Sequence, residues 1–361
     1  MPRPSANIVL FSDGTGNSSG KLFRTNVWRT YQAVDLKDPQ QLQIPRQFAF
    51  YDDGVGTSSF RPLAFLGGAV GVGLARNVRD IYAFVCRTYQ PGDKIYAFGF
   101  SRGAFTIRIA LGLILDQGLV RYDGNEGTLK RKVNAAYRRF RRDNFNHAGG
   151  LVQSLRWTRD CIIGAWERSP RPTYDEVRNP NVPGSTIEIE FVGLWDTVAA
   201  YGLPVDEMTR AVDWAFWPLT MPDYDLSPRV KRAMHALSLD DERNTFHPKL
   251  WNETEADVVR PGGQTRPPKD GDEWSDASRI SQVWFAGVHS NLGGGYPDDT
   301  LSYVSLGWIL KGAKQAGLRL IPHVAKEYGD LADENGPIYD SRSGLAGVLS
   351  LQSSPDLGRH Q

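Results

Sequence analysis

Five short apolar runs, each followed by small or polar residues, constrain the fold of this 361-residue chain more than any other feature. The runs are expected to form strands and span residues 8–11, 48–51, 95–100, 187–194 and 283–288. Helical spacing of apolar residues fills most of the stretches between them. Strands that alternate with helices predict an α/β fold, with a mostly parallel central sheet flanked by helices.

Polar side chains follow four of these runs directly. Asp13, Ser101, Asp196 and His289 each come just after the last apolar residues of a predicted strand. In open parallel sheets, catalytic and binding groups gather at the carboxyl ends of the strands. We therefore expect these four side chains to share one rim of the sheet.

The length and composition, with 40% hydrophobic and 23% charged residues, predict a single large domain over residues 1–340. Two segments lack the strand–helix alternation and are expected to be insertions. The first, about 122–183, is basic and helical, and the second, about 203–278, is a candidate cap over the rim. Residues 341–361 are expected to form a loosely ordered tail.

The charge balance, 42 Lys and Arg against 41 Asp and Glu, gives no global field that would attract nucleic acid. The basic run from Lys130 to Arg142 has two interpretations. It is either a contact for nucleic acid or phospholipid head groups or, as the near-neutral total charge favours, a solvated helix face.

Targeting signals and cysteines point to a reduced compartment. The N-terminus lacks the pattern of a secretory signal peptide, and the apolar tract from Pro62 to Ala75 is too short to span a membrane. Cys86 and Cys161 are expected to be reduced core residues. A cytoplasmic protein is expected, with delivery out of the cell by a signal-less route left open.

The segment GFSRG, residues 99–103, matches the G-x-S-x-G pattern of a nucleophile elbow. Gly99 and Gly103 would allow a sharp turn from strand to helix, and that turn would expose the hydroxyl of Ser101. The alternative is a serine that only caps a helix in a tight turn.

A serine nucleophile requires a base and an acid that orients the base. Among six histidines, His289 is the best candidate because it lies on a glycine-rich loop after a strand, whereas His235 lies in a stretch with helical spacing. Asp196 precedes it in the order Ser, Asp, His that is typical of α/β-hydrolases. The rival acids are Asp240, Asp241 and Glu242, expected at a helix end, and Asp298.

The oxyanion hole of this fold uses the backbone N–H after the nucleophile, here that of Arg102, and one from a loop after an early strand. The DGTGN loop supplies Gly14 or Thr15 for the second. Asp13 would repel an oxyanion, so its side chain is expected to turn away and brace loop amides or a neighbouring strand end. Alternatively, it ligates a metal together with Asp52, Asp53 or Asp196.

Five ordered motifs carry a resemblance that covers the chain from Ile8 to about Ala316. They are FSDGTGN, YDDGVGT, PGDKIYAFGFSRGAFTIR, FVGLWDTV and VWFAGVHSNLGGGYPDDTLS. The chain resembles the α/β-hydrolase family, long catalogued as a domain of unknown function, that includes the first class of type VI secretion lipase effectors. The resemblance implies a phospholipase-like serine hydrolase with Ser101 as nucleophile, Asp196 as acid and His289 as base.

The leading hypothesis is therefore a hydrolase of carboxylic esters, with phospholipid acyl esters as the favoured substrate and no cofactor or metal. The candidate partners are a lipid or ester substrate, a membrane surface contacted peripherally, and a secretion-apparatus or immunity protein. A secreted effector and a housekeeping lipase or esterase both stay open. The alternatives are a metal-dependent phosphoesterase and a non-catalytic binding module on a hydrolase scaffold. The oligomeric state is left open.

Overall fold

The computed structural model describes residues 3–14, 23–38, 44–54, 68–144, 172–198, 225–241, 248–253 and 278–339. Its centre is a sheet of six parallel strands in the order β2-β1-β3-β4-β5-β6. The strands are β1 (Asn7–Ser12), β2 (Gln47–Asp52), β3 (Lys94–Phe100), β4 (Ile189–Trp195), β5 (Ala233–Ser238) and β6 (Ile280–Phe285). The predicted α/β class with a parallel central sheet is confirmed.

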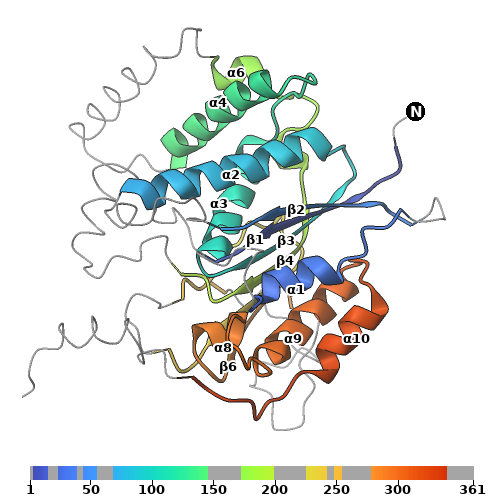
Figure 1. The fold of residues 1–361 in the computed structure, drawn as a ribbon. Coiled ribbons are helices and arrows are strands. Elements are labelled where there is room, and N and C mark those ends of the chain that lie inside the picture. Colours follow the sequence, from blue (N-terminus) through green and yellow to red (C-terminus); the bar gives the residue numbers. More distant parts are fainter. Residues whose placement is uncertain are drawn as a thin grey trace, which may run out of the picture.

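Helices cover both faces of the sheet (Figure 1). On one face lie α2 (Gly68–Thr88), α3 (Arg102–Gln117), α4 (Glu126–Asn144) and the short α6 (Tyr174–Val177). On the other lie α1 (Asn26–Ala33), α8 (His289–Gly293), α9 (Ser302–Gln315) and α10 (Pro322–Asp330). A short 3-10 helix, Gly184–Thr186, leads into β4.

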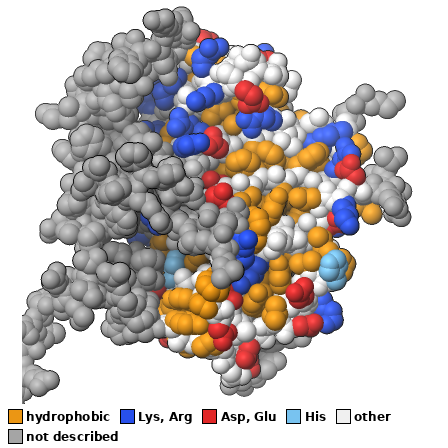
Figure 2. Space-filling view, in the orientation of Figure 1, with side chains coloured by type: hydrophobic (Ala, Val, Ile, Leu, Met, Phe, Trp, Pro, Cys, Tyr) orange, Lys and Arg blue, Asp and Glu red, His pale blue; other side chains and the backbone are white. Residues whose placement is uncertain are grey.

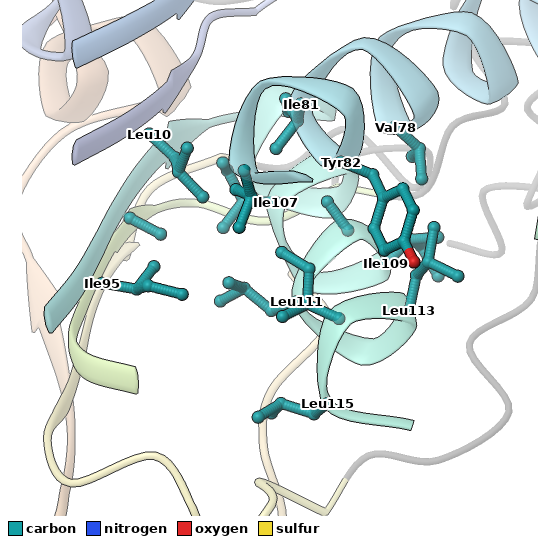
Figure 3. Packing of buried hydrophobic residues seen from close by; sticks show 14 of the residues in the cluster. Leu10, Val78, Ile81, Tyr82, Ile95, Ile107, Ile109, Leu111, Leu113 and Leu115 are labelled. Atoms are coloured by element: carbon teal, nitrogen blue, oxygen red, sulfur yellow. The ribbon is translucent and has the colours of Figure 1, made fainter. Parts of the chain in front are cut away.

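Alternation along the central strands divides the core into two layers. In β1, Ile8 and Leu10 belong to the cluster under α2, α3 and α4, whereas Val9 and Phe11 belong to the cluster under α1 and α9. Successive side chains of a strand point to opposite faces, so a strand covered on both sides must be apolar throughout. Figure 3 shows the first layer, where Leu10 and Ile95 of the sheet face Ile107 and Leu111 of α3.

The basic run forms most of α4, which is amphipathic. Its buried face includes Val133, Tyr137 and Phe140, while Lys132 pairs with Asp123 on the outside. Figure 2 shows basic side chains in the upper part of the view interspersed with acidic ones. This arrangement agrees with the interpretation as a solvated helix face.

Two expectations about the later part of the chain were wrong. The stretch around His235, expected to be helical, is strand β5, so Ala233–Ser238 belongs to the central sheet and not to an insertion or cap. The strand expected at 283–288 begins earlier and ends at Phe285. Most of the predicted cap, Cys161 and the tail 341–361 lie outside the described residues.

Cys86 is a buried free thiol in α2, as expected. Burial raises its pKa to about 12, which keeps it protonated and unreactive at neutral pH. Within the described ranges, no helix combines the length and apolar character that crossing a membrane requires.

Candidate active site

Ser101 lies at the turn from β3 into α3, in a conformation that serine rarely adopts. Its φ of 59° and ψ of −126° fall outside the regions favoured by residues with a Cβ atom. Its backbone N–H donates to the carbonyl of Trp195 at 3.0 Å, which ties the turn to the end of the neighbouring strand β4. The strained strand-to-helix turn predicted from GFSRG is thus present.

The two glycines of the pattern are required by close backbone contacts. A Cβ atom on Gly99 would lie 2.6 Å from Cα of Ala104, and one on Gly103 would lie 2.0 Å from the carbonyl oxygen of Ser12. The first contact lets the helix turn back over its own strand. The second brings the start of α3 against the carboxyl end of β1.

Asp196 follows the last residue of β4 and is fully buried. It is, with Ser101, one of two non-glycine residues with positive φ in the described ranges, at 42°. Its Oδ2 accepts a hydrogen bond from the hydroxyl of Ser238 at 2.8 Å and lies 2.5 Å from Nδ1 of His289. The carboxylate is therefore oriented from the end of β5 towards the imidazole.

His289 is the first residue of α8 and is buried. Its Nδ1 faces Asp196, so Nε2 lies on the opposite edge of the ring. Its ring packs on Phe100, with centroids 4.6 Å apart, and Phe100 is the neighbour of Ser101 in the elbow. Ser101 and Asp196 thus lie at the ends of the neighbouring strands β3 and β4, and His289, which follows β6, reaches Asp196 from two strands away.

The rival acids have other contacts. Asp240 accepts from the amide of Gly287 at 2.6 Å, and Asp241 accepts from the amide of His289 at 3.2 Å. Both follow β5, not a helix, and they support the backbone on which His289 is held. Asp298 is exposed, and Glu242 lies outside the described residues.

His235, on β5, is a buried histidine that the sequence pattern placed in the wrong element. Its Nε2 accepts from the N–H of Thr197 at 3.1 Å, next to Asp196. Burial lowers the pKa of His235 to about 3, so the ring is neutral. It supports the turn after β4, and the short apolar run AMHALS does not by itself distinguish a strand from a buried helix.

Two of the predicted oxyanion donors, Arg102 and Gly14, lie within the described residues. Arg102 is the first residue of α3, where backbone N–H groups have no partner within the helix. The N–H of Gly14 instead donates to Oδ1 of Asp13 at 2.6 Å. Thr15 lies outside the described residues.

The carboxylates proposed as metal ligands are engaged by protein donors. Asp13 accepts from Thr25 at 2.5 Å and Tyr51 at 2.6 Å, and Asp52 accepts from Ser12 at 2.8 Å and Asn77 at 2.7 Å. Burial is the main reason why the pKa of each is raised to about 6. Three or more His, Cys, Asp or Glu side chains do not converge on a metal site anywhere in the described ranges.

Three features define the α/β-hydrolase class. They are a doubly covered parallel sheet, a strained serine at the turn after β3, and a carboxylate–imidazole pair from residues that follow β4 and β6. Within this class the chain belongs to the family described as T6SS, Phospholipase effector Tle1-like, catalytic domain, whose sequence model matches residues 6–312. The domain is a carboxylic ester hydrolase.

More distant similarities extend over most of the chain. A Saccharomyces cerevisiae protein, Uncharacterized protein YEL023C, is 24% identical over 253 residues, which are 66% of this chain and 32% of that protein. This chain therefore spans about a third of the length of that relative. The Thermogutta terrifontis esterase Est2 is 14% identical, with a TM-score of 0.38 over 89% of this chain and 85% of the esterase. A bifunctional GH43-CE protein of Bacteroides eggerthii is 11% identical, with a TM-score of 0.30 over 87% and 35% of the two chains.

Proposed function

We propose that this domain cleaves an acyl ester of a phospholipid through an acyl-enzyme on Ser101. His289 acts as general base and acid, and Asp196 orients its ring. The observation that carries the proposal is the 2.5 Å contact between Nδ1 of His289 and the buried Asp196, formed beside the strained turn of Ser101.

The reaction has two balanced steps. The hydroxyl oxygen of Ser101 attacks the ester carbonyl while Nε2 of His289 takes its proton, and the proton then passes to the leaving alkoxide as the C–O bond breaks. A water molecule next attacks the acyl-enzyme, with His289 again accepting and returning the proton. The products are a fatty acid and a lysophospholipid.

Asp196 supports both steps by stabilising the imidazolium that forms when His289 is protonated. Because Asp196 has no solvent exposure and is held by Ser238, its carboxylate stays aligned with Nδ1. The amide of Arg102 would donate to the tetrahedral oxyanion, with a second donor from the loop after β1.

The choice of phospholipid is supported by the family and by the side chain of Arg102. This half-buried guanidinium follows Ser101 directly, and burial lowers its pKa only to about 10, so it is charged at neutral pH. No described carboxylate forms an ion pair with it. A cation on the residue that follows the nucleophile favours an ester that carries a nearby phosphate.

Lipid mass spectrometry tests the proposal. Phospholipid vesicles treated with wild-type protein should release fatty acid and lysophospholipid in equal amounts, and Ser101→Ala, with an unchanged circular dichroism spectrum, should release neither. A fluorophosphonate probe should label the wild type and not the variant. Equal product release by the two proteins would refute the nucleophile assignment.

The same assay separates the alternatives. A metal-dependent phosphoesterase would release a phosphorylated head group or phosphate and would stop on addition of a chelator. A binding module would retain vesicles without product or label. If the enzyme is a secreted effector, as the family description suggests, its partners include the secretion apparatus and an immunity protein, and its membrane contact is peripheral.

A further inference from the structure

Asp13 is a buried carboxylate at the end of β1, and the two-step reaction gives it no part. It touches the elbow through its backbone, since a Cβ atom on Gly103 would lie 2.5 Å from the Asp13 carbonyl oxygen. Its side chain turns away from this contact and accepts three hydrogen bonds, from the amide of Gly14 and the hydroxyls of Thr25 and Tyr51. The residue therefore connects the elbow to elements outside it.

Thr25 extends this connection to α1. Its hydroxyl donates to Oδ2 of Asp13 at 2.5 Å and accepts from the N–H of Trp28 at 3.3 Å, so it is the N-cap of the helix. The backbone of Thr25 also forms an antiparallel bridge with Gly294, the residue that follows α8. One threonine thus joins Asp13, the start of α1 and the end of α8.

The start of α1 holds α8 by further buried contacts. The side-chain amide of Asn26 donates to the carbonyl of Leu292, in α8, at 2.9 Å and to that of Ser302, in α9, at 2.8 Å. One turn later, Arg29 pairs with Asp299 at 2.7 Å. Since α8 has only five residues and begins with His289, these contacts contribute, with those of Asp196 and Asp241, to the placement of the imidazole.

We propose that Asp13 is a positioning residue of the candidate site. Through its backbone, Gly14 and Thr25, it fixes the relative positions of the elbow, the start of the loop after β1 and the helix α8 that begins with His289. This inference goes beyond the ester hydrolysis proposed for Ser101, and it rests on that proposal because its readout is the rate of the same reaction.

The chemistry of the cluster explains why a carboxylate is needed. All three partners of Asp13 donate to it, and an ionised carboxylate offers only acceptor sites. An asparagine would direct an N–H group at one of these donors and break the arrangement without changing its size. The phenol of Tyr51 stays protonated and can donate to Asp13, since burial and the nearby Asp13 carboxylate raise its pKa well above the usual value.

Asp52 provides a matched control one strand away. It lies at the end of β2, has a pKa raised to about 6 by burial like that of Asp13, and accepts from Ser12 and Asn77. Neither of these partners contacts α1 or α8 in the interactions described above. Asp52→Asn therefore removes a similar charge without interrupting the connection to His289.

The experiment measures kcat, KM and the rate of fluorophosphonate labelling for Asp13→Asn, Thr25→Val, their double variant and Asp52→Asn. Each value is normalised to the folded fraction from urea unfolding. Asp13→Asn and Thr25→Val should each lower kcat and the labelling rate by about 10- to 100-fold with little change in KM, because small misplacement of reacting groups has effects of this size. The double variant should lose no more than the larger single loss.

Two further variants sharpen the result. Asp52→Asn should retain kcat even where it lowers stability, and Thr25→Ser, which keeps the hydroxyl, should retain most of kcat. A merely structural Asp13 would lower stability and leave kcat and labelling per folded molecule intact, which would overturn the inference. Failure of the wild type to be labelled at Ser101 would instead overturn the proposed function, so the two failures are distinguishable.

Discussion

Gly103→Ala and Gly112→Ala place the same methyl group on the same helix, α3, with opposite expected effects. At position 103 the new Cβ atom would lie 2.0 Å from the carbonyl oxygen of Ser12 and 2.5 Å from that of Asp13. In Gly112 the nearest atom would be the ring tip of Phe140 at 3.4 Å, an ordinary contact. The pair therefore separates helix propensity from steric exclusion.

The magnitudes follow from these contacts. Alanine is about 1 kcal/mol better than glycine inside a helix, so Gly112→Ala should stabilise the domain by about 0.5–1 kcal/mol. At Gly103 the same gain is opposed by overpacking, which costs about 1–3 kcal/mol or more, and the obstacle is backbone that must shift by about 1 Å. Because backbone must move, the cost lies at the upper end of this range, and we expect a net loss of about 2 kcal/mol.

Urea unfolding of the three proteins, with ester hydrolysis measured on the same samples, tests this reasoning. Gly103→Ala should also lose activity by up to about 100-fold, because its methyl group displaces the carboxyl end of β1 beside Ser101. Gly112→Ala should keep wild-type activity. A Gly103→Ala protein that is as stable and active as the wild type would refute the packing described for the elbow.

Three further predictions concern charge. Asp196→Asn should lower kcat by about 10³–10⁴-fold in a protein with unchanged circular dichroism, because the imidazolium of His289 loses its counter-charge; a loss below tenfold would contradict the assigned role. The pKa of His235 is lowered to about 3, so the unfolded chain binds the extra proton first as pH falls from about 6.5. The stability that comes from a neutral His235 is complete above that pH and declines by up to about 1.4 kcal/mol per pH unit towards pH 3. Urea unfolding between pH 4 and 7 should therefore show a flatter dependence of stability on pH for His235→Gln than for the wild type. Equal slopes for the two proteins would argue against a buried, neutral His235. Arg102→Gln should lower kcat/KM for a phospholipid about tenfold more than for a neutral ester, whereas equal losses would remove the support for an anionic substrate.

The central strands were predictable because each is buried on both faces and therefore appears as a continuous apolar run. The run at 8–11 corresponds to β1 and that at 95–100 to β3, within one residue at each end. The candidate residues at their ends followed from the rule for parallel sheets. This reasoning needed only local sequence and the order of the elements.

Strand β5 was missed for a physical reason. Ala233, Met234, Ala236 and Leu237 are all good helix formers and are spaced as on a helix face, so the local preference opposes the observed strand. The strand forms because β4 and β6 pair with it on either side. Tertiary context of this kind is absent from a short window of sequence.

The contacts of Asp13 were foreseen only in part. The expectation that its side chain turns away to brace loop amides agrees with its hydrogen bond from Gly14. Its partners Thr25 and Tyr51 lie 12 and 38 residues further along the chain. Nothing in the DGTGN loop itself indicates which hydroxyl groups will reach it.

The hydrogen bonds of Asn26 also determine when, during synthesis of the chain, this part of the fold can form. Its partner Ser302 follows 276 residues later, and ribosomes add about 5–20 residues per second. Roughly 15–55 s of synthesis therefore separate the two ends of this contact. Until that segment emerges, α1 has no α8 to hold, so the contacts that join α1, α8 and α9 form only near the end of translation of this domain.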